Sequence, residues 1–234
     1  MFFPFPQLLK LVSSSDLTNR EDADDRCVRE EKRREEKRRS SLKLVDELQE
    51  LKLMTDQILP QVLEQILSDS KTADAVFSAL VPALGEVLNC DRVFLYLRNP
   101  ETQRGRVPYC WRRNSNYPDV SGAEWKKEPE SLGEEDPLFA AALRTKPSIF
   151  VEDVETANPD VVNKDFEAKE FGHRALIHAH LCSDGLLWGV LQPCIFDRPR
   201  VWTDFDRQVI AAVTEKISPL AVAFVTASAS KDKR

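Results

Sequence analysis

The stretch FGHRALIHAHLCSDGLLWGVLQPCIFDRPRVW, residues 171–202, carries the strongest fold signal in the chain. Two apolar runs, residues 175–182 and 186–195, flank Ser183-Asp184-Gly185. A glycine in so short a connection between apolar runs is typical of a β-hairpin turn. The stretch therefore predicts two central antiparallel strands.

The regions on either side of this hairpin complete one predicted domain. Apolar runs predict three further strands, at residues 92–98, 107–113 and 148–153. Helical spacing predicts helices at residues 75–88, 138–144 and 166–170. It also predicts a final helix that begins at the capping-box-like pair Thr203 and Asp206 and carries an apolar stripe of Val209, Ile210, Val213 and Ile217. Residues 114–135 are predicted to form a long polar loop. The order indicates an α+β fold: an antiparallel sheet of five to six strands with helices packed on one face, preceded by a long N-terminal helix.

Charge distinguishes an N-terminal segment from this domain. Residues 20–40 are dense in Lys, Arg, Asp and Glu of nearly balanced number, whereas the whole chain has a net charge of −6. An acidic body lacks the basic surface that binds phosphate backbones, so no nucleic-acid partner is expected. The seven glycines form no GxGxxG or GxxxxGK pattern, which excludes phosphate-binding loops of those kinds.

Apolar residues at heptad spacing follow the charged run. They alternate at spacings of four and three and predict a short coiled coil, hence a homodimer: Leu44, Leu48, Leu51, Thr55, Ile58 and Val62. Pro60 limits this helix or kinks it. The expected organisation is a flexible segment or docking peptide (1–25), a charged helix (26–62), the domain (63–225) and a polar tail (226–234). No apolar run has the length and flanks of a transmembrane segment.

Four motifs carry a resemblance to a known family. They are DPLF at 136–139, FVEDV at 150–154, FGHRALIHAHL at 171–181 and LWGVLQPCIFDRPRVW at 187–202. With the order of elements, they resemble a GAF domain over about residues 63–225, most closely the bilin-binding GAF domains of phytochromes and cyanobacteriochromes. The resemblance implies a small-molecule sensor or dimerisation module. It also implies a ligand pocket between the sheet and the loops opposite the terminal helices.

The resemblance further implies where a chromophore would attach. The cysteine and histidine of the family's attachment site correspond to Asn163 and Lys164 here, and the second cysteine of some members corresponds to Leu138. None of these side chains forms a thioether, so covalent attachment at either position is not expected. Any bilin or other tetrapyrrole would bind without a covalent bond.

Strand alternation selects further pocket candidates. Period-two alternation places Leu176, His178 and His180 on one face, and the resemblance adds Cys194 on the neighbouring strand. The two imidazoles, with Arg174, are candidates to bind a tetrapyrrole or a small acid, and the imidazoles alone a metal. The alternative is that they are satisfied polar groups beneath the long loop, and that Cys194 is a small buried hydrophobe. No catalytic or metal site is assigned.

Three functions remain at this point. The first is a non-enzymatic regulatory or scaffolding protein that dimerises and docks to a separate partner or larger assembly, with a degenerate pocket. The second is a sensor that holds a bilin or other small molecule non-covalently. The third is a redox enzyme of the GAF type that reduces free methionine sulfoxide, for which Cys182 and Cys194 come too late in the sequence.

Two expectations concern the setting of the protein. Five widely spaced cysteines without a CxxC pair indicate reduced thiols and a cytoplasmic location, with the plastid stroma as the alternative. The resemblance to photoreceptor domains implies a photosynthetic organism. Because only residues 226–234 follow the final helix, the signal is expected to pass to a separate protein.

Overall fold

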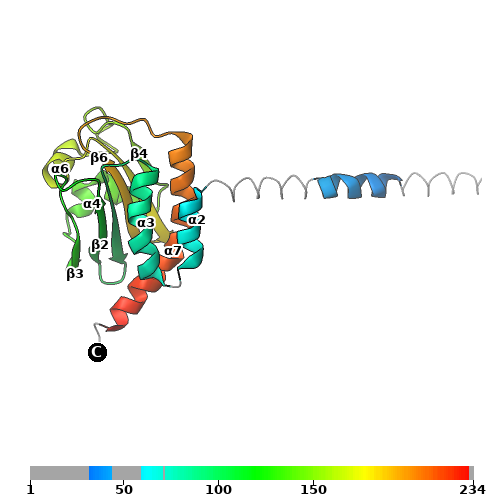
Figure 1. Ribbon diagram of the computed structural model, residues 1–234, viewed down its shortest axis with the longest axis horizontal. Helices are drawn as coiled ribbons and strands as arrows, with labels where there is room; N and C mark the ends of the chain where they lie inside the picture. Colours follow the sequence, from blue (N-terminus) through cyan, green and yellow to red (C-terminus); the bar gives the residue numbers. More distant parts are fainter. Residues whose placement is uncertain (1–31, 44–58, 71, 232–234) are drawn as a thin grey trace, which may run out of the picture. The chain divides into compact units, whose positions relative to one another are not determined.

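The computed structural model describes residues 32–43, 59–70 and 72–231. The chain divides into two compact units, Met1–Asp56 and Gln57–Arg234, and each is described by itself. In the first unit, residues 32–43 form an exposed helix (Figure 1). Within it, Glu35 and Arg39 make an i,i+4 ion pair with an oxygen–nitrogen distance of 2.9 Å. Of the predicted heptad residues, Leu44, Leu48, Leu51, Thr55 and Ile58 lie outside the described residues.

The second unit is built on a six-stranded antiparallel sheet with the order β3-β2-β1-β6-β5-β4 (Figure 1). The strands are β1 (Arg92–Asn99), β2 (Arg104–Arg112), β3 (Gly122–Lys127), β4 (Ile149–Val151), β5 (Ala175–Ser183) and β6 (Leu186–Ile195). The predicted central hairpin is confirmed as β5 and β6. Asp184 and Gly185 connect the two strands with φ values of 52° and 73°, the left-handed backbone of a tight hairpin turn.

Three longer helices cover one face of this sheet. They are α2 (Gln61–Asp69), α3 (Ala73–Val87) and α7 (Asp204–Lys231). Pro60 precedes α2 in an extended conformation, with ψ of 139°, so the chain is not helical across it, and Val62 in α2 is 45% exposed. The predicted capping box of α7 is confirmed: Thr203 N donates to Asp206 Oδ2, and Asp206 N donates to Thr203 Oγ1.

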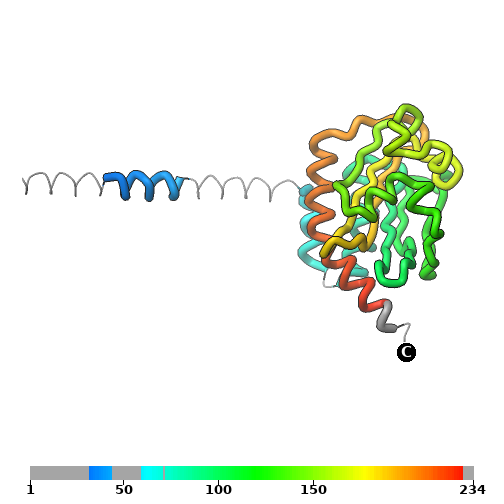
Figure 2. The backbone as a smooth tube through the Cα atoms, turned by 180° about the vertical axis from the view of Figure 1, so that it is seen from behind, coloured from blue at the N-terminus to red at the C-terminus, as the bar shows by residue number. Residues whose placement is uncertain are grey.

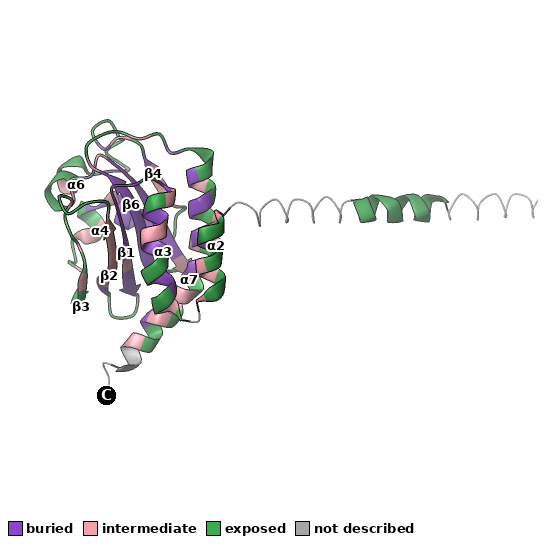
Figure 3. Cartoon of the chain, viewed as in Figure 1, coloured by how far each residue is buried: buried purple, intermediate pink, exposed green. Residues whose placement is uncertain are grey.

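The main core lies between these helices and the sheet. Its α7 residues form the predicted apolar stripe of Val209, Ile210, Val213 and Ile217. Figure 3 shows buried residues along the surfaces of the helices and strands that face each other. By length and composition, residues 204–228 of α7 could cross a membrane, but the apolar stripe is used in this core. The helix continues to Lys231, so the first residues of the predicted polar tail are helical.

The opposite face carries three short helices. They are α4 (Leu132–Glu135), α5 (Pro137–Leu143) and α6 (Lys164–Glu170). In Figures 1 and 2, α4 and α6 gather away from α2 and α7. The predicted α+β fold is confirmed, and the prediction of helices on one face holds for the three longer ones.

The prediction of one long loop over residues 114–135 was wrong. This region contains the edge strand β3 and the helix α4. β3 pairs with β2 through Arg104 opposite Lys127, Gly105 opposite Lys126 and Val107 opposite Gly122. Most of its side chains are exposed, so it has no apolar alternation from which a strand could be predicted.

Candidate functional site

A cavity of about 590 Å³ lies on the sheet face opposite α2, α3 and α7, and we call it the central cavity. Its floor comes from β1, β5 and β6, one side from β2 and β3, and its walls from α4, α5 and α6. Aromatic and aliphatic side chains contribute much of the lining, among them Phe94, Tyr96, Leu138, Phe139, Phe171 and Val190. A mostly apolar hollow with a few polar groups is the usual form of a small-molecule site.

Strand register places polar side chains on this floor. Phe94 of β1 lies opposite Gln192 of β6. On β5, Leu176 lies opposite Cys194 and Ala179 opposite Leu191, so the residue opposite Gln192 is His178. Gln192 and His178 are each 4% exposed and both line the cavity. A buried polar group is costly unless it finds a hydrogen-bond partner, which makes these side chains the centre of the candidate site.

The two histidines of β5, which were predicted to share one face, form a hydrogen-bonded pair. Nδ1 of His178 lies 2.9 Å from Nε2 of His180. Nδ1 of His180 lies 2.6 Å from the carbonyl oxygen of Lys146. Burial, together with His180 and His173, lowers the pKa of His178 well below its usual value. Burial also lowers the pKa of His180, although its bond to Lys146 acts in the other direction, so both rings are neutral near pH 7.

Asp136 contributes a buried carboxyl group to the cavity wall. Its side chain caps α5, because Oδ1 accepts a hydrogen bond of 2.9 Å from the backbone N–H of Leu138. The residue is 9% exposed. Burial raises the pKa of Asp136 to about 6, with Glu167 adding to the rise and backbone N–H groups of the first turn opposing it.

Behind the cavity wall lies a buried network of hydrogen-bonded polar side chains. The sequence did not predict this network. Arg92, fully buried at the start of β1, donates to the Pro118 carbonyl at 2.9 Å and to Nε2 of His173. Nδ1 of His173 bonds the carboxylate of Glu167, which lines the cavity from α6. An arginine at a strand end is ordinarily exposed, so no single-sequence signal distinguishes Arg92.

Charged residues surround the outer part of the cavity. Tyr96 donates from its hydroxyl to Glu128 at 2.6 Å, and Arg98 binds the same carboxylate at 2.9 to 3.1 Å. Burial, reinforced by Glu128, raises the pKa of Tyr96, so the phenol keeps its proton. Lys126 and Lys127 of β3 also line the cavity and are exposed. Glu124 and Glu170 line the cavity as well, so its lining carries charges of both signs.

Of the eight predicted pocket residues, Leu138 and His178 line the central cavity. Leu176 lies on the same face and is buried in a cluster with Phe94 and Leu138. His180 instead borders a separate surface hollow next to α7. Cys194 is buried, with Sγ 3.5 Å from the carbonyl oxygens of Arg92 and Gln192.

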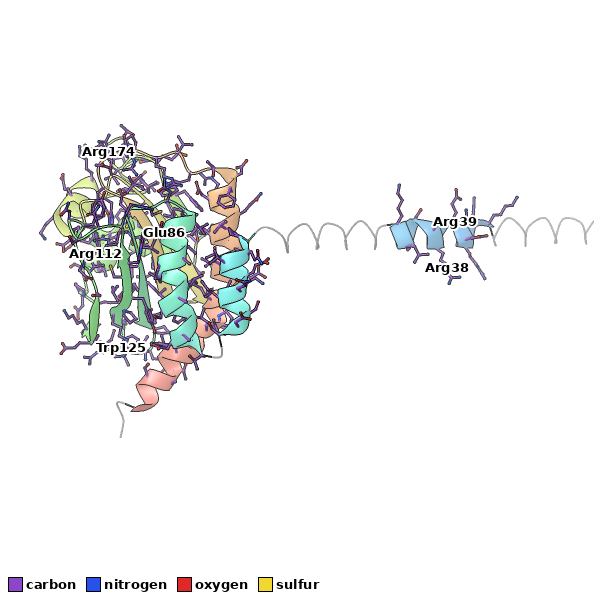
Figure 4. All side chains as sticks on the ribbon, in the orientation of Figure 1. Arg38, Arg39, Glu86, Arg112, Trp125 and Arg174 are labelled. Carbon is purple, nitrogen blue, oxygen red and sulfur yellow. The ribbon has the colours of Figure 1, made fainter. Side chains whose placement is uncertain are left out.

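The other three predicted residues have structural partners away from the cavity. Asn163 caps α6 through Phe166 N and donates to the Glu135 carbonyl at 2.9 Å. Lys164 is paired with Glu155 on the surface. Arg174 binds Asp153 through two hydrogen bonds of 2.6 and 2.9 Å, and Figure 4 shows it toward the end of the domain remote from Trp125 of β3.

Among the described residues, Cys182, Cys194 and the metal-ligand side chains form no second site. Burial raises the pKa of Cys182, which reduces its reactive thiolate form, and neither Cys182 nor Cys194 lines the central cavity. Across residues 32–43, 59–70 and 72–231, no group of three or more His, Cys, Asp or Glu side chains could hold a metal ion.

Comparison with known proteins identifies the fold. The family model described as GAF domain matches residues 72–218. The GAF domain of an Acinetobacter phosphoenolpyruvate-protein phosphotransferase superposes with a TM-score of 0.55 at 12% identity, covering 75% of this chain and 97% of that one. The phycoerythrobilin-bound GAF domain of a cyanobacterial phytochrome gives 0.54 at 18% identity, covering 71% and 94%.

A third structure extends this likeness. The chromophore-binding domain of a bacteriophytochrome from R. palustris gives a TM-score of 0.55 at 14% identity, covering 71% of this chain and 60% of that one. At these identities the likeness concerns the fold alone. No curated protein sequence matches the chain.

Proposed function

Because the chain belongs to the GAF domain family, we propose that it is a non-catalytic regulatory protein whose central cavity binds a planar small molecule. GAF domains are generally regulatory or sensory. The observation that carries the proposal is the cavity itself, which is of ligand size and encloses the buried polar groups of His178 and Gln192. A degenerate pocket, as expected from the sequence, is the alternative to this proposal.

The lining supports a ligand that is flat and partly apolar. Phe94 and Phe171 lie nearly parallel with ring centroids 6.5 Å apart, and Tyr96 meets Phe139 edge to face at 6.2 Å. Aromatic walls favour stacking of a conjugated ring system. Lys126 and Lys127 can pair with an acidic substituent at the outer end, in competition with Glu124 and Glu128 of the same lining.

A bilin or another tetrapyrrole, held without a covalent bond, is one candidate of this class. It is supported by the bilin-bound structure that shares the fold and by the combination of aromatic walls with basic groups. Among the described residues that line the cavity there is no cysteine to attach such a ligand.

An absorption spectrum tests this candidate. The full chain, purified after co-expression with bilin synthesis, is expected to show a visible band that disappears on denaturation and extraction of the pigment. Gly122→Phe is expected to lose the band, because Gly122 lines the cavity and the new ring would take the place of the ligand. The substitution is tolerated by the fold, since a Cβ added at Gly122 meets no atom within 4 Å. Gly133→Phe, on α4 and outside the cavity lining, is the matched control and keeps it. No band in the wild type contradicts the bilin candidate.

The proposal also includes a homodimer that passes its signal to a separate protein. It is supported by the heptad spacing from Leu44 to Ile58, on the N-terminal side of Pro60. Light scattering on the full chain and on a variant without residues 1–55 is expected to give a dimer and a monomer. An equal number of protomers in the two proteins contradicts this role of the N-terminal helix.

A further inference from the structure

The two ring nitrogens of His178 have different surroundings. Nδ1 is bonded within the protein, 2.9 Å from Nε2 of His180. No described residue is hydrogen-bonded to Nε2, and this atom is not fully buried, so it has access to the central cavity that the side chain lines. A polar atom in this position is available to a ligand in the cavity.

The positions of the hydrogens in the His178–His180 pair follow from the bond between His180 and the Lys146 carbonyl. The Lys146 carbonyl can only accept, so Nδ1 of His180 carries a hydrogen. A neutral imidazole has one N–H, which leaves Nε2 of His180 as an acceptor. Nδ1 of His178 must then donate to it, and Nε2 of His178 is left without a hydrogen.

We infer that His178 presents Nε2 to the central cavity as a hydrogen-bond acceptor and thereby selects ligands that carry an N–H or O–H donor. This inference rests on the proposed ligand-binding function and specifies the ligand class. His180 is a positioning residue, since it acts on the ligand only by fixing the tautomer of His178.

The surroundings of His178 agree with this selection. Asp136 and Glu167 place two further acceptor groups on the cavity lining, and Glu167 is already bonded to His173. A carboxylate placed against Nε2 would meet a lone pair and no donor, so the expectation that His178 and His180 bind an acid is not supported. The favoured ligand has a ring N–H at its inner end, as in a pyrrole or indole, and an acidic group, if any, near Lys126 and Lys127.

Nitrogen NMR of the full chain with isotope-labelled histidine tests the tautomer, and the chain has only three histidines. Nε2 of His178 is expected to give a resonance of the unprotonated type near pH 7. His180→Leu removes the acceptor for Nδ1 and is expected to populate the form protonated on Nε2, whereas His180→Gln supplies an amide oxygen and retains the original form. Ser148→Ala removes only the hydroxyl that accepts from the His180 backbone N–H, so it is the control and leaves the tautomer unchanged.

Two probes of matched size test the selection. Indole and benzofuran differ in replacing the N–H by an oxygen, and indole is expected to bind at least about tenfold more tightly and to shift the Nε2 resonance of His178. Equal affinities, or a protonated Nε2 in the wild type, would overturn the inference. If neither probe binds while Nε2 is unprotonated, the acceptor assignment is upheld and the proposed ligand-binding function loses its support.

Discussion

The buried carboxyl group of Asp136 makes the stability of this domain depend on pH in a direction unusual for an aspartate. Burial raises its pKa from 3.8 to about 6, so the folded state binds this proton more tightly than the unfolded chain does. The carboxyl therefore contributes stability below about pH 4, and the contribution is lost as the pH rises through about 6. The difference between the two pKa values corresponds to about 3 kcal/mol.

Asp136→Asn removes the charge and keeps the cap of α5, because asparagine caps helices as well as aspartate and its carbonyl can accept from Leu138 N. We expect the variant to be more stable than the wild type at about pH 7.5, by up to about 3 kcal/mol, and equally stable near pH 4. The variant also loses a negative charge at the N-terminus of α5. This loss reduces the gain in stability by an amount between a few tenths of a kcal/mol and about 1 kcal/mol.

Urea unfolding followed by circular dichroism across this pH range measures the difference. Asp153→Asn is the control of opposite sign, since the hydrogen bond from Arg174 lowers the pKa of Asp153. That variant should be less stable than the wild type at neutral pH, with a difference that vanishes in acid. A stability difference for Asp136→Asn that does not change with pH, or a less stable variant at about pH 7.5, would refute the reasoning.

Three further predictions concern packing and turns and are measured by thermal or urea unfolding. Gly189→Ala should lower the free energy of unfolding by about 1–3 kcal/mol, because the added Cβ would lie 2.5 Å from the carbonyl oxygen of Tyr96 on the neighbouring strand. An unchanged unfolding midpoint would show that the two strands can separate locally. Gly185→Ala should lower the free energy of unfolding by about 1–2 kcal/mol, since φ is 73° at this residue. Its control, Gly122→Ala, should change the free energy of unfolding by less than about 0.5 kcal/mol. Equal effects of the two substitutions would contradict the role of the turn. Trp202→Phe should cost about 1 kcal/mol through loss of the 2.9 Å bond from Nε1 to the Val151 carbonyl, and no loss would assign the stabilisation to ring packing alone.

Local patterns in the sequence were sufficient for most elements of the fold. The β5 and β6 hairpin, the capping box at Thr203 and the apolar stripe of α7 depend on neighbouring residues, so spacing alone predicts them. β3 was missed because an exposed edge strand stabilised by pairing with β2 has no such pattern. The shared face of His178 and His180 was predicted because strand alternation is also local.

Most of the candidate site could not be predicted in this way. Asn163, Lys164 and Arg174 are polar residues near the predicted site, but their partners on the surface or at the end of a helix draw them away from the cavity. Arg92, His173 and Glu167 come from three separate segments, and nothing in the local sequence relates them.

The sequence by itself determined the hairpin, the helix stripe and the family resemblance, because each follows from short-range spacing. Only the tertiary structure decided which polar groups enclose the central cavity and which nitrogen of His178 faces it. The physical reason is that burial and hydrogen-bond partners are properties of the assembled sheet and its covering helices. The tautomer of His178 depends on the carbonyl of Lys146, which lies outside β5 and reaches the pair only in the folded chain.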